Sequence, residues 1–352
     1  MPAMSKRKLT RQQAWRIEKI RTERARRAAR ASATQNLAEI QPGDAHPDDD
    51  TAAHPEREGL VIAHYGLQVD IEAPDQNGTQ RVTRCHLRAN LNGLVTGDRV
   101  VFCPGEPVGV VVAQLARHSE LRRPDASGNL KAVAANIDQI AIVIAPLPTP
   151  HANLLDRYLV AAEETGARPM IVVNKSDLLQ DPSLSAQLEE LLQVYPQLGY
   201  PVLRCSKYGA LDELRQALRN RTSVLVGQSG VGKTSLLNAL LPDAAPQRTG
   251  ALSEGTHKGT HTTTTAVLFH LPDGGHLIDS PGIREFGLGH LSRYAVESGF
   301  REFHPFLGHC RFRDCRHRSE PGCALLAAVD TGSIPAQRLA SYRHIITSLD
   351  GT

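Results

Sequence analysis

The sequence is poor in aromatic residues and has no long apolar run. Aromatic side chains make up 4% of its 352 residues, with a single Trp, so few rings are available for stacking on nucleic-acid bases. No stretch approaches the ~20 apolar residues of a membrane-spanning helix, and the N-terminus lacks the apolar segment of a secretory signal. We therefore expect a cytoplasmic chain without membrane contact, and its length suggests two or three domains.

The net charge is small but unevenly distributed. Residues 1–31 hold 11 Lys and Arg against Glu18 and Glu23, a net +9, which leaves −6 on the rest of a chain whose overall charge is +3. A basic arm on a mildly acidic body favours nucleic acid as the partner, bound through its phosphates. Trp15 can stack on a base, although a solvated charged tail is the alternative. Residues 32–57 have few large apolar residues and are predicted to be a disordered linker.

Short strands separated by turn residues begin near residue 59. Five are predicted, at 60–65, 67–71, 80–87, 98–102 and 109–115. They indicate a small β-barrel of the OB type, assigned to residues 58–118. Such barrels often bind oligonucleotides, and the side chains suited to phosphate contacts are Arg81, Arg84, Arg88 and Arg99. A purely structural barrel is the alternative, because stacking aromatics are few.

Strands and helices alternate after residue 138. Strands are expected at 139–144, 170–173, 202–205 and 223–226, with helices at 153–163, near 185–194 and near 211–218. This alternation predicts a doubly wound α/β sheet within residues 119–288.

A glycine-rich segment follows the strand that ends at residue 226 and precedes a helical pattern. A phosphate-binding loop needs this setting, because glycines let backbone N–H groups surround phosphate oxygens and the helix N-terminus attracts anions. Lys233 can reach the β/γ-phosphates, and Thr234 can bind Mg²⁺. The candidate nucleotide-binding residues here are Gly227, Gln228, Ser229, Gly230, Val231, Gly232, Lys233, Thr234 and Ser235.

A second motif, Asn174-Lys175-Ser176-Asp177, lies at the end of another predicted strand. An Asp there can accept both N1–H and the exocyclic amine of guanine, a donor pair that adenine does not offer. The alternative interpretation is an ordinary polar turn between a strand and a helix, with no role in nucleotide binding. Ser206 and Lys207, also at a strand end, are placed to touch guanine O6 through backbone N–H groups.

The third motif is Asp279-Ser-Pro-Gly282, again after a predicted strand. Its Asp would hold Mg²⁺ through water, and the Gly N–H would meet the γ-phosphate of GTP. Together the three motifs predict a GTPase. Their order is unusual, because the guanine motif precedes the phosphate loop and Asp-x-x-Gly comes last, so the sequence predicts a circular permutation. We also expect nucleotide state to move the region that follows Gly282.

Residues 255–265 contain four consecutive threonines after two glycines and two histidines. This composition suggests a loop that places a hydroxyl, assigned to Thr263, on Mg²⁺. The residue after Asp-x-x-Gly is Ile283, which cannot orient water as the Gln of many small GTPases does. His261 is the candidate substitute, and an ordinary solvated His is the alternative.

The C-terminal region, assigned to 289–352, contains the spacing C-x4-C-x-H-x5-C. Three thiolates and one imidazole suit a closed, tetrahedral and structural Zn²⁺ site, whereas a disulfide would suit a secreted chain. The predicted zinc ligands are Cys310, Cys315, His317 and Cys323, and Arg311, Arg313, Arg316 and Arg318 among them suit RNA phosphates or solvent.

Permuted nucleotide motifs between a predicted OB barrel and a Cys3His site resemble the ribosome small-subunit-dependent GTPase A family (RsgA/YjeQ). The resemblance spans nearly the whole chain, including Asn136-Ile-Asp138, Asp156-Arg-Tyr and His261-Thr-Thr-Thr. It implies a late assembly factor of the bacterial 30S subunit that binds 16S rRNA near the decoding region. GTP hydrolysis would be stimulated by the subunit, with His261 as the catalytic residue.

Departures from the family pattern are Ala89, Lys207-Tyr208 and Thr260. We expect a monomer with one structural Zn²⁺ that binds GTP and GDP with Mg²⁺. The alternatives are a GTP-gated RNA-binding scaffold whose turnover is incidental and a translation factor that acts on whole ribosomes.

Overall fold

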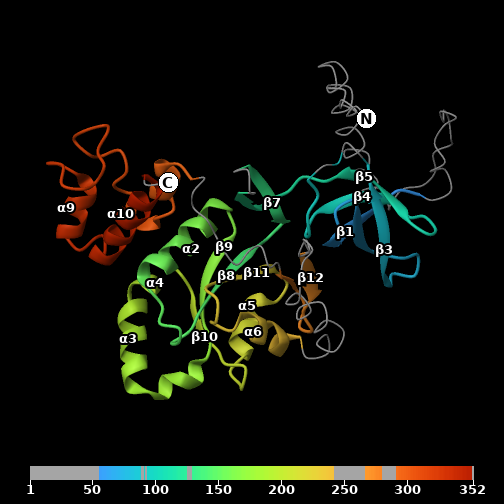
Figure 1. The fold of residues 1–352 in the computed structure, drawn as a ribbon, viewed down its shortest axis with the longest axis horizontal. Coiled ribbons are helices and arrows are strands. Elements are labelled where there is room, and N and C mark those ends of the chain that lie inside the picture. The colour runs from blue at the N-terminus through green and yellow to red at the C-terminus, as the bar shows by residue number, and fades with distance from the viewer. Residues whose placement is uncertain are drawn as a thin grey trace, which may run out of the picture. The chain divides into compact units, whose positions relative to one another are not determined.

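The computed structural model describes residues 55–88, 91, 93–124, 129–241, 266–279 and 291–350 (Figure 1). The predictions for the basic arm, for Trp15 and for most of the linker lie outside these residues. The chain divides into two compact units, residues 1–117 and 118–352. Within the described ranges, no helix has the length and apolar character that crossing a membrane requires.

The first unit is a closed five-stranded barrel. Its strands are β1 (Arg57–His64), β2 (Gln68–Pro74), β3 (Gln80–Leu87), β4 (Arg99–Cys103) and β5 (Gly109–Gln114). The order β1-β2-β3-β5-β4 closes because β1 pairs with both β2 and β4, and β3 runs parallel to β5. Alternate residues fill the interior, among them Val69, Ile71 and Phe102. The OB-type barrel predicted from the strand spacing is confirmed.

The second unit begins with a hairpin that the sequence pattern did not predict. Strands β6 (Glu120–Pro124) and β7 (Leu130–Ala135) form a separate antiparallel pair. Leu121 and Ala134, opposite each other in the register, are buried, while Arg122 is exposed. A short strand with so few apolar positions has little periodic signal, which explains why it was missed.

The larger sheet carries the predicted α/β pattern. Its strands are β8 (Gln139–Ile144), β9 (Arg168–Val173), β10 (Val202–Arg204), β11 (Thr222–Val226), β12 (Val267–His270) and β13 (His276–Asp279). Their spatial order is β10-β9-β8-β11-β13-β12, parallel except for the antiparallel pair β12–β13. All six residues of β8 are buried, as expected of a central strand covered on both faces.

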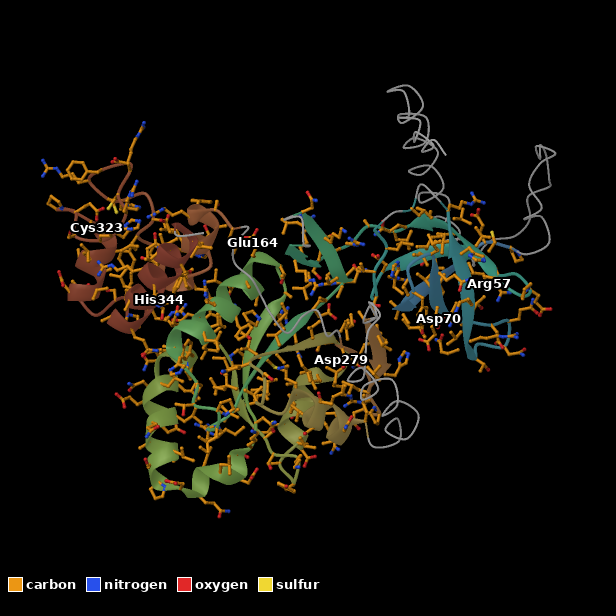
Figure 2. The ribbon with its side chains drawn as sticks, viewed as in Figure 1. Arg57, Asp70, Glu164, Asp279, Cys323 and His344 are labelled. Atoms are coloured by element: carbon orange, nitrogen blue, oxygen red, sulfur yellow. The ribbon has the colours of Figure 1, made fainter. Side chains whose placement is uncertain are left out.

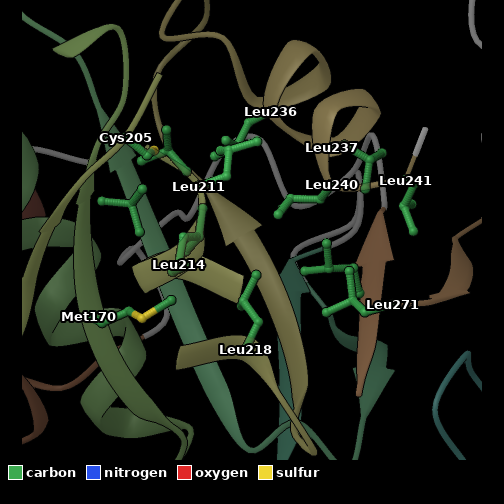
Figure 3. Close-up of a cluster of buried hydrophobic side chains, with 14 of the residues drawn as sticks. Met170, Cys205, Leu211, Leu214, Leu218, Leu236, Leu237, Leu240, Leu241 and Leu271 are labelled. Atoms are coloured by element: carbon green, nitrogen blue, oxygen red, sulfur yellow. The ribbon is translucent and has the colours of Figure 1, made fainter. Parts of the chain in front are cut away.

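Helices follow most of these strands. They are α2 (Ala152–Glu164), α3 (Pro182–Leu192), α4 (Val194–Gln197), α5 (Asp212–Leu218) and α6 (Lys233–Leu240), with the 3-10 helix η1 at Ser176–Gln180. Leucines of α5 and α6 pack on Ala141 and Val143 of β8 and on Met170 of β9 (Figure 3). Ile140 and Ile142 point to the opposite face of the sheet and are equally buried.

The C-terminal region is helical and shares its core with α2. It contains α8 (Arg293–Ser298), the 3-10 helix η5 (Arg301–Phe303), α9 (Ala324–Asp330) and α10 (Ala336–Asp350). Val160 and Ala161 of α2 belong to the same buried cluster as Phe300, Phe303 and Tyr342. The helices after residue 290 are therefore packed on the α/β sheet through α2.

Candidate nucleotide-binding and metal sites

The three predicted nucleotide motifs follow strands of the same sheet. Asn174 comes directly after β9, Gly227 after β11, and Asp279 is the last residue of β13 (Figure 2). These strands run parallel, so their carboxyl ends meet at one edge of the sheet, where open α/β sheets bind ligands. The neighbours β9-β8-β11-β13 therefore bring together motifs that are far apart in the sequence.

Two glycines of the phosphate loop, Gly227 and Gly232, occupy positions with no room for a side chain. Gly227 has φ of 142°, and a Cβ there would lie 2.2 Å from the Val143 carbonyl oxygen. Gly232 has φ of 93°, and its Cβ would lie 2.5 Å from the side-chain nitrogen of Asn174. The loop thus passes so close to β8 and to the guanine motif that it excludes side chains at both positions.

Lys233 and Thr234 open helix α6 after this loop. The Lys233 ammonium donates to the carbonyl oxygens of Gly227 (2.6 Å) and Gln228 (2.8 Å), which holds it along the loop. Thr234 is exposed at the start of the helix. Val231 is buried and anchors the loop. The other members of the loop that are exposed to solvent are Gln228, Ser229, Gly230 and Ser235.

The guanine motif is tied to the phosphate loop by side-chain hydrogen bonds. Asn174 is buried, and its Nδ2 donates to the Val231 carbonyl oxygen at 2.9 Å. Lys175 has φ of 57°, and its Nζ donates to the carbonyl oxygens of Gly230 (2.7 Å) and Leu147 (2.8 Å). The lysine thereby joins the phosphate loop to the segment after β8, a contact that sequence patterns did not indicate.

Asp177 is oriented by a neighbouring loop. The Ser206 hydroxyl donates to Asp177 Oδ1, and Ser206 itself is buried. The Ser176 N–H donates to the Cys205 carbonyl oxygen at 3.0 Å, which fixes the same two loops together. Beside them the Lys207 ammonium lies 4.8 Å from the centroid of the exposed Tyr208 ring. In this arrangement Asp177 Oδ2 can accept a hydrogen bond from a donor group on the edge of a nucleotide base.

Part of the predicted catalytic machinery lies outside the described residues. Asp279 ends β13 and is half-buried. His261, Thr263, Gly282 and Ile283 belong to the ranges 242–265 and 280–290, which the structure does not describe. Their roles stay predictions.

The four predicted metal ligands converge in the C-terminal region. The sulfur atoms of Cys310, Cys315 and Cys323 and Nδ1 of His317 all lie within 4.8 Å of one another. His317 Nδ1 is 3.3 Å from the Cys323 sulfur and 3.5 Å from the other two. Bonds of about 2.0–2.3 Å in a tetrahedron place ligand atoms roughly 3.3–3.8 Å apart. The residues therefore fit a tetrahedral metal ion.

A carboxylate lies beside the imidazole nitrogen of His317 that is not directed at the cysteine sulfur atoms. Glu297 Oε1 lies 3.6 Å from His317 Nε2 and also accepts a hydrogen bond from the Tyr342 hydroxyl at 2.7 Å. A carboxylate on the second imidazole nitrogen fixes the ring for metal binding. Glu297 is in α8, well before the Cys/His segment, so the spacing of the ligands gave no sign of it.

Known proteins resemble this chain along its whole length. A model of the RsgA GTPase family matches residues 114–289. Over 349 residues, 98% of each chain, the sequence is 60% identical to Small ribosomal subunit biogenesis GTPase RsgA of Azotobacter vinelandii. The protein of that name from Pseudomonas aeruginosa is 58% identical over 352 residues, 99% of each chain.

Two solved structures share the fold. YjeQ from Thermotoga maritima aligns with a TM-score of 0.68 and 30% identity, covering 85% of this chain and 100% of that one. YloQ, described as a circularly permuted GTPase, aligns with a TM-score of 0.67 and 26% identity, covering 85% and 96%. The chain therefore belongs to the RsgA GTPase family of GTP-hydrolysing enzymes.

Proposed function

We propose that this GTPase acts late in the maturation of the small ribosomal subunit and uses GTP to time its residence there. The observation that carries the proposal is identity of 58–60% along the whole chain to proteins named small ribosomal subunit biogenesis GTPases. The permuted nucleotide motifs at one edge of the sheet support the hydrolytic part of the role. Its partners are then GTP, GDP, the 30S subunit and 16S rRNA near the decoding region.

Guanine recognition is assigned to the loops after β9 and β10. Asp177, oriented by the Ser206 hydroxyl, accepts N1–H and the exocyclic amine of the base. Asn174 holds the phosphate loop in register, and the Lys175 stem covers the base while its ammonium clamps Gly230. The backbone N–H of Lys207 is proposed to face guanine O6, because the Ser206 N–H donates to the Gly209 carbonyl oxygen at 3.3 Å.

The phosphates are assigned to the loop 227–235. Its backbone N–H groups and the Lys233 ammonium contact phosphate oxygens, as glycine-rich loops at helix N-termini do. The hydroxyl of Thr234, at the start of the helix after β11, and the carboxylate of Asp279, at the end of the adjacent strand β13, are oxygen ligands that suit Mg²⁺, and Thr263 is proposed to complete the set. Mg²⁺, when bound, neutralises charge on the β- and γ-phosphates.

His261 is proposed to orient the attacking water or to accept its proton, with the N–H of Gly282 meeting the γ-phosphate. An imidazole suits this role because its unperturbed pKa is near neutrality. Ile283 offers no polar group for the task, so turnover by the protein alone should be slow until the subunit orders this loop.

The remaining regions are proposed to hold the protein on the subunit. The arm and linker (1–57) and the barrel (58–118) contact rRNA phosphates, the GTPase domain spans 119–288, and the C-terminal domain (289–352) carries one structural Zn²⁺ on its Cys3His set. The protein is proposed to be a cytoplasmic monomer.

The first test is GTP hydrolysis by the purified protein alone, with 30S subunits and with 70S ribosomes, using ATP as the control nucleotide. The proposal expects strong stimulation by 30S subunits and no turnover of ATP. His261→Ala should abolish the stimulated rate, whereas the matched change His270→Ala, at an exposed position on β12, should not.

Other outcomes would redirect the assignment. Stimulation by 70S ribosomes equal to that by 30S subunits would indicate a translation factor. Subunit assembly that proceeds normally with an inactive His261 or Asp279 variant would favour the GTP-gated scaffold. Fast turnover without any ribosome would contradict the need for a partner to order His261.

A further inference from the structure

A depression of about 540 Å³ lies on the barrel. It opens between the β2–β3 turn (75–79) and the β4–β5 turn (104–108), beside the start of β1 and residues 81–84 of β3. Arg81 is opposite Ala73 in the β2–β3 register, and Arg57 is opposite Phe102 in the β1–β4 register. The volume is in the range of small-ligand sites.

Three guanidinium groups line this depression, and one of them has a carboxylate partner among the described residues. Arg84 donates through Nε and Nη2 to Asp70, and its guanidinium lies 4.6 Å from the centroid of the Tyr65 ring. Arg57 and Arg81 have no carboxylate within 4 Å in the part of the chain that the structure describes. Both line the same hollow, and Arg57 is marked on the barrel in Figure 2. Guanidinium groups of this kind suit a phosphate.

The rest of the wall is made of apolar, acidic and uncharged polar residues, the last being Gln76, Asn77 and Thr83. Phe102 and Ala73 form part of it with Pro104 and Pro107, and Val82 is 51% exposed. Asp75 Oδ1 accepts the N–H groups of residues 77 and 79 (2.8 and 3.0 Å), so that oxygen serves the turn.

Glu106 adds an exposed carboxylate at the rim. A wall with both signs of charge suits a purely anionic partner poorly. It suits a nucleotide, which presents a phosphate, an apolar base face and, in three of the four bases, an amine donor.

We infer that this depression receives one unstacked nucleotide of a single-stranded RNA segment. Its phosphate contacts Arg57 and Arg81, its base lies against Val82 and the proline-lined floor, and Glu106 accepts from an exocyclic amine. Proteins read RNA mainly at such splayed-out bases. The inference rests on the proposed function, because it assigns a subsite to the RNA that the barrel is proposed to bind.

The test uses the full chain and a short fluorescent single-stranded RNA of mixed sequence, with a series of the same RNA in which one position at a time is abasic. Binding is measured by anisotropy over a range of salt concentrations. The variant is Arg57→Gln/Arg81→Gln. The matched control, Arg215→Gln/Arg219→Gln, removes the same charge from two arginines at the C-terminal end of α5, in the second unit and outside the depression.

For the wild type we expect one abasic position to weaken binding by about fivefold, the lower end of the range for a base stacked on an aromatic ring, because Val82 and the prolines offer no aromatic face. The double variant should weaken binding of the intact RNA by about tenfold or more relative to the control and lower the salt slope by about 0.7, as for one phosphate contact on a single strand. It should also lose the sensitivity to the abasic position. Its GTP hydrolysis in the absence of ribosomes should match that of the wild type.

Three results would overturn the inference. One is equal binding of intact and abasic RNA by the wild type, and another is equal binding by the variant and the control. The third is displacement of the RNA by an acidic peptide in the wild type but not in the variant, which would assign the hollow to a protein segment. If 30S subunits still stimulate hydrolysis in any of these cases, the subsite is wrong and the proposed function stands. If 30S subunits did not stimulate hydrolysis but RNA binding remained sensitive to the abasic position, the subsite would stand and the proposed function would be wrong.

Discussion

At the scale of single residues, chemistry at the nucleotide site is decided by how side chains are held. Asp177 is identifiable from its motif, but its orientation depends on the Ser206 hydroxyl, 29 positions later in the chain. Asn174 and Lys175 similarly bond to the phosphate loop more than 50 positions away. Under the proposed assignment, recognition of guanine depends on a carboxylate that is oriented by a residue after another strand.

Asp177→Asn should change the base that the protein accepts. The carboxylate accepts two hydrogen bonds from guanine, whereas the carboxamide presents a donor that clashes with the exocyclic amine of guanine and suits the second carbonyl of xanthine. We expect GTP affinity to fall by about 100-fold or more, since hydrogen bonds to charged groups contribute about 1.5–3 kcal/mol each. Xanthosine triphosphate should bind better than GTP, as measured by displacement of a fluorescent nucleotide.

The control is Asp212→Asn, at a carboxylate that is 97% exposed on α5. It should leave both affinities unchanged. Unchanged GTP affinity in Asp177→Asn would show that this residue does not read the base.

At the scale of elements, the C-terminal helices are joined to α2 by buried charge. Arg338 of α10 is fully buried between Asp156 of α2 and Glu302 of η5, and it lies 4.4 Å from the centroid of the Phe300 ring. The Tyr195 hydroxyl also donates to Asp156, at 2.8 Å. Burial raises the pKa of the Asp156 carboxyl, and the nearby Arg338 opposes that rise. Any movement of the C-terminal region relative to α2 would have to break this contact.

Arg338→Met should therefore destabilise the second unit strongly. It leaves Asp156 and Glu302 buried without their counter-charge, and breaking a buried pair from one side costs about 3–5 kcal/mol of unfolding free energy. Denaturant unfolding measures the change. Arg338→Met/Asp156→Leu should recover part of the loss, because the second change removes one of the uncompensated charges.

The exposed pair Arg215–Asp212 supplies the comparison. Arg215→Met should cost no more than about 1 kcal/mol, as surface pairs do. If Arg338→Met cost equally little, the buried network would not be what joins the C-terminal helices to α2.

At the scale of the whole molecule, the six cysteines fall into two groups. Cys310, Cys315 and Cys323 converge with His317, whereas Cys85 and Cys103 are buried in the barrel and Cys205 is buried beside the guanine motif. Burial raises the pKa of Cys85 to about 12 and that of Cys205 to about 11. At pH 8 roughly one Cys205 thiol in a thousand would be ionised, and only the thiolate reacts.

Removing the metal should make only the three cysteines of the Cys3His cluster reactive toward a thiol reagent. A strong chelator at pH 8 should make Cys310, Cys315 and Cys323 react quickly with a thiol reagent and should lower the Tm of the second unit, since a structural metal contributes folding free energy. Cys85 and Cys205 should stay slow in the chelated protein, and added Zn²⁺ should restore the initial rates. Labelling followed by peptide mass spectrometry identifies the thiols. Rapid reaction of all three cluster thiols before chelation would argue against a bound metal.

Much of this protein was predictable because its signals are local. The strand spacing of the barrel, the alternation of strands and helices, the glycines at 227 and 232 and the spacing of the Cys/His ligands each reflect a constraint within a short segment. The permuted order of the motifs was equally visible, because it is a property of the sequence itself. The structure confirms these elements, and the strand order explains how permuted motifs reach one edge.

Other features were decided by tertiary structure alone. The β6–β7 hairpin, the support of His317 by Glu297, the clamp from Lys175 to the Leu147 carbonyl and the burial of Arg338 had no local signal. A sequence pattern predicts that a charged residue lies on the surface. A backbone carbonyl is present in every residue, so the sequence cannot indicate which one will accept a particular hydrogen bond. Only packing segments far apart in the chain removes such groups from water, and once buried they must find partners that no local rule can name.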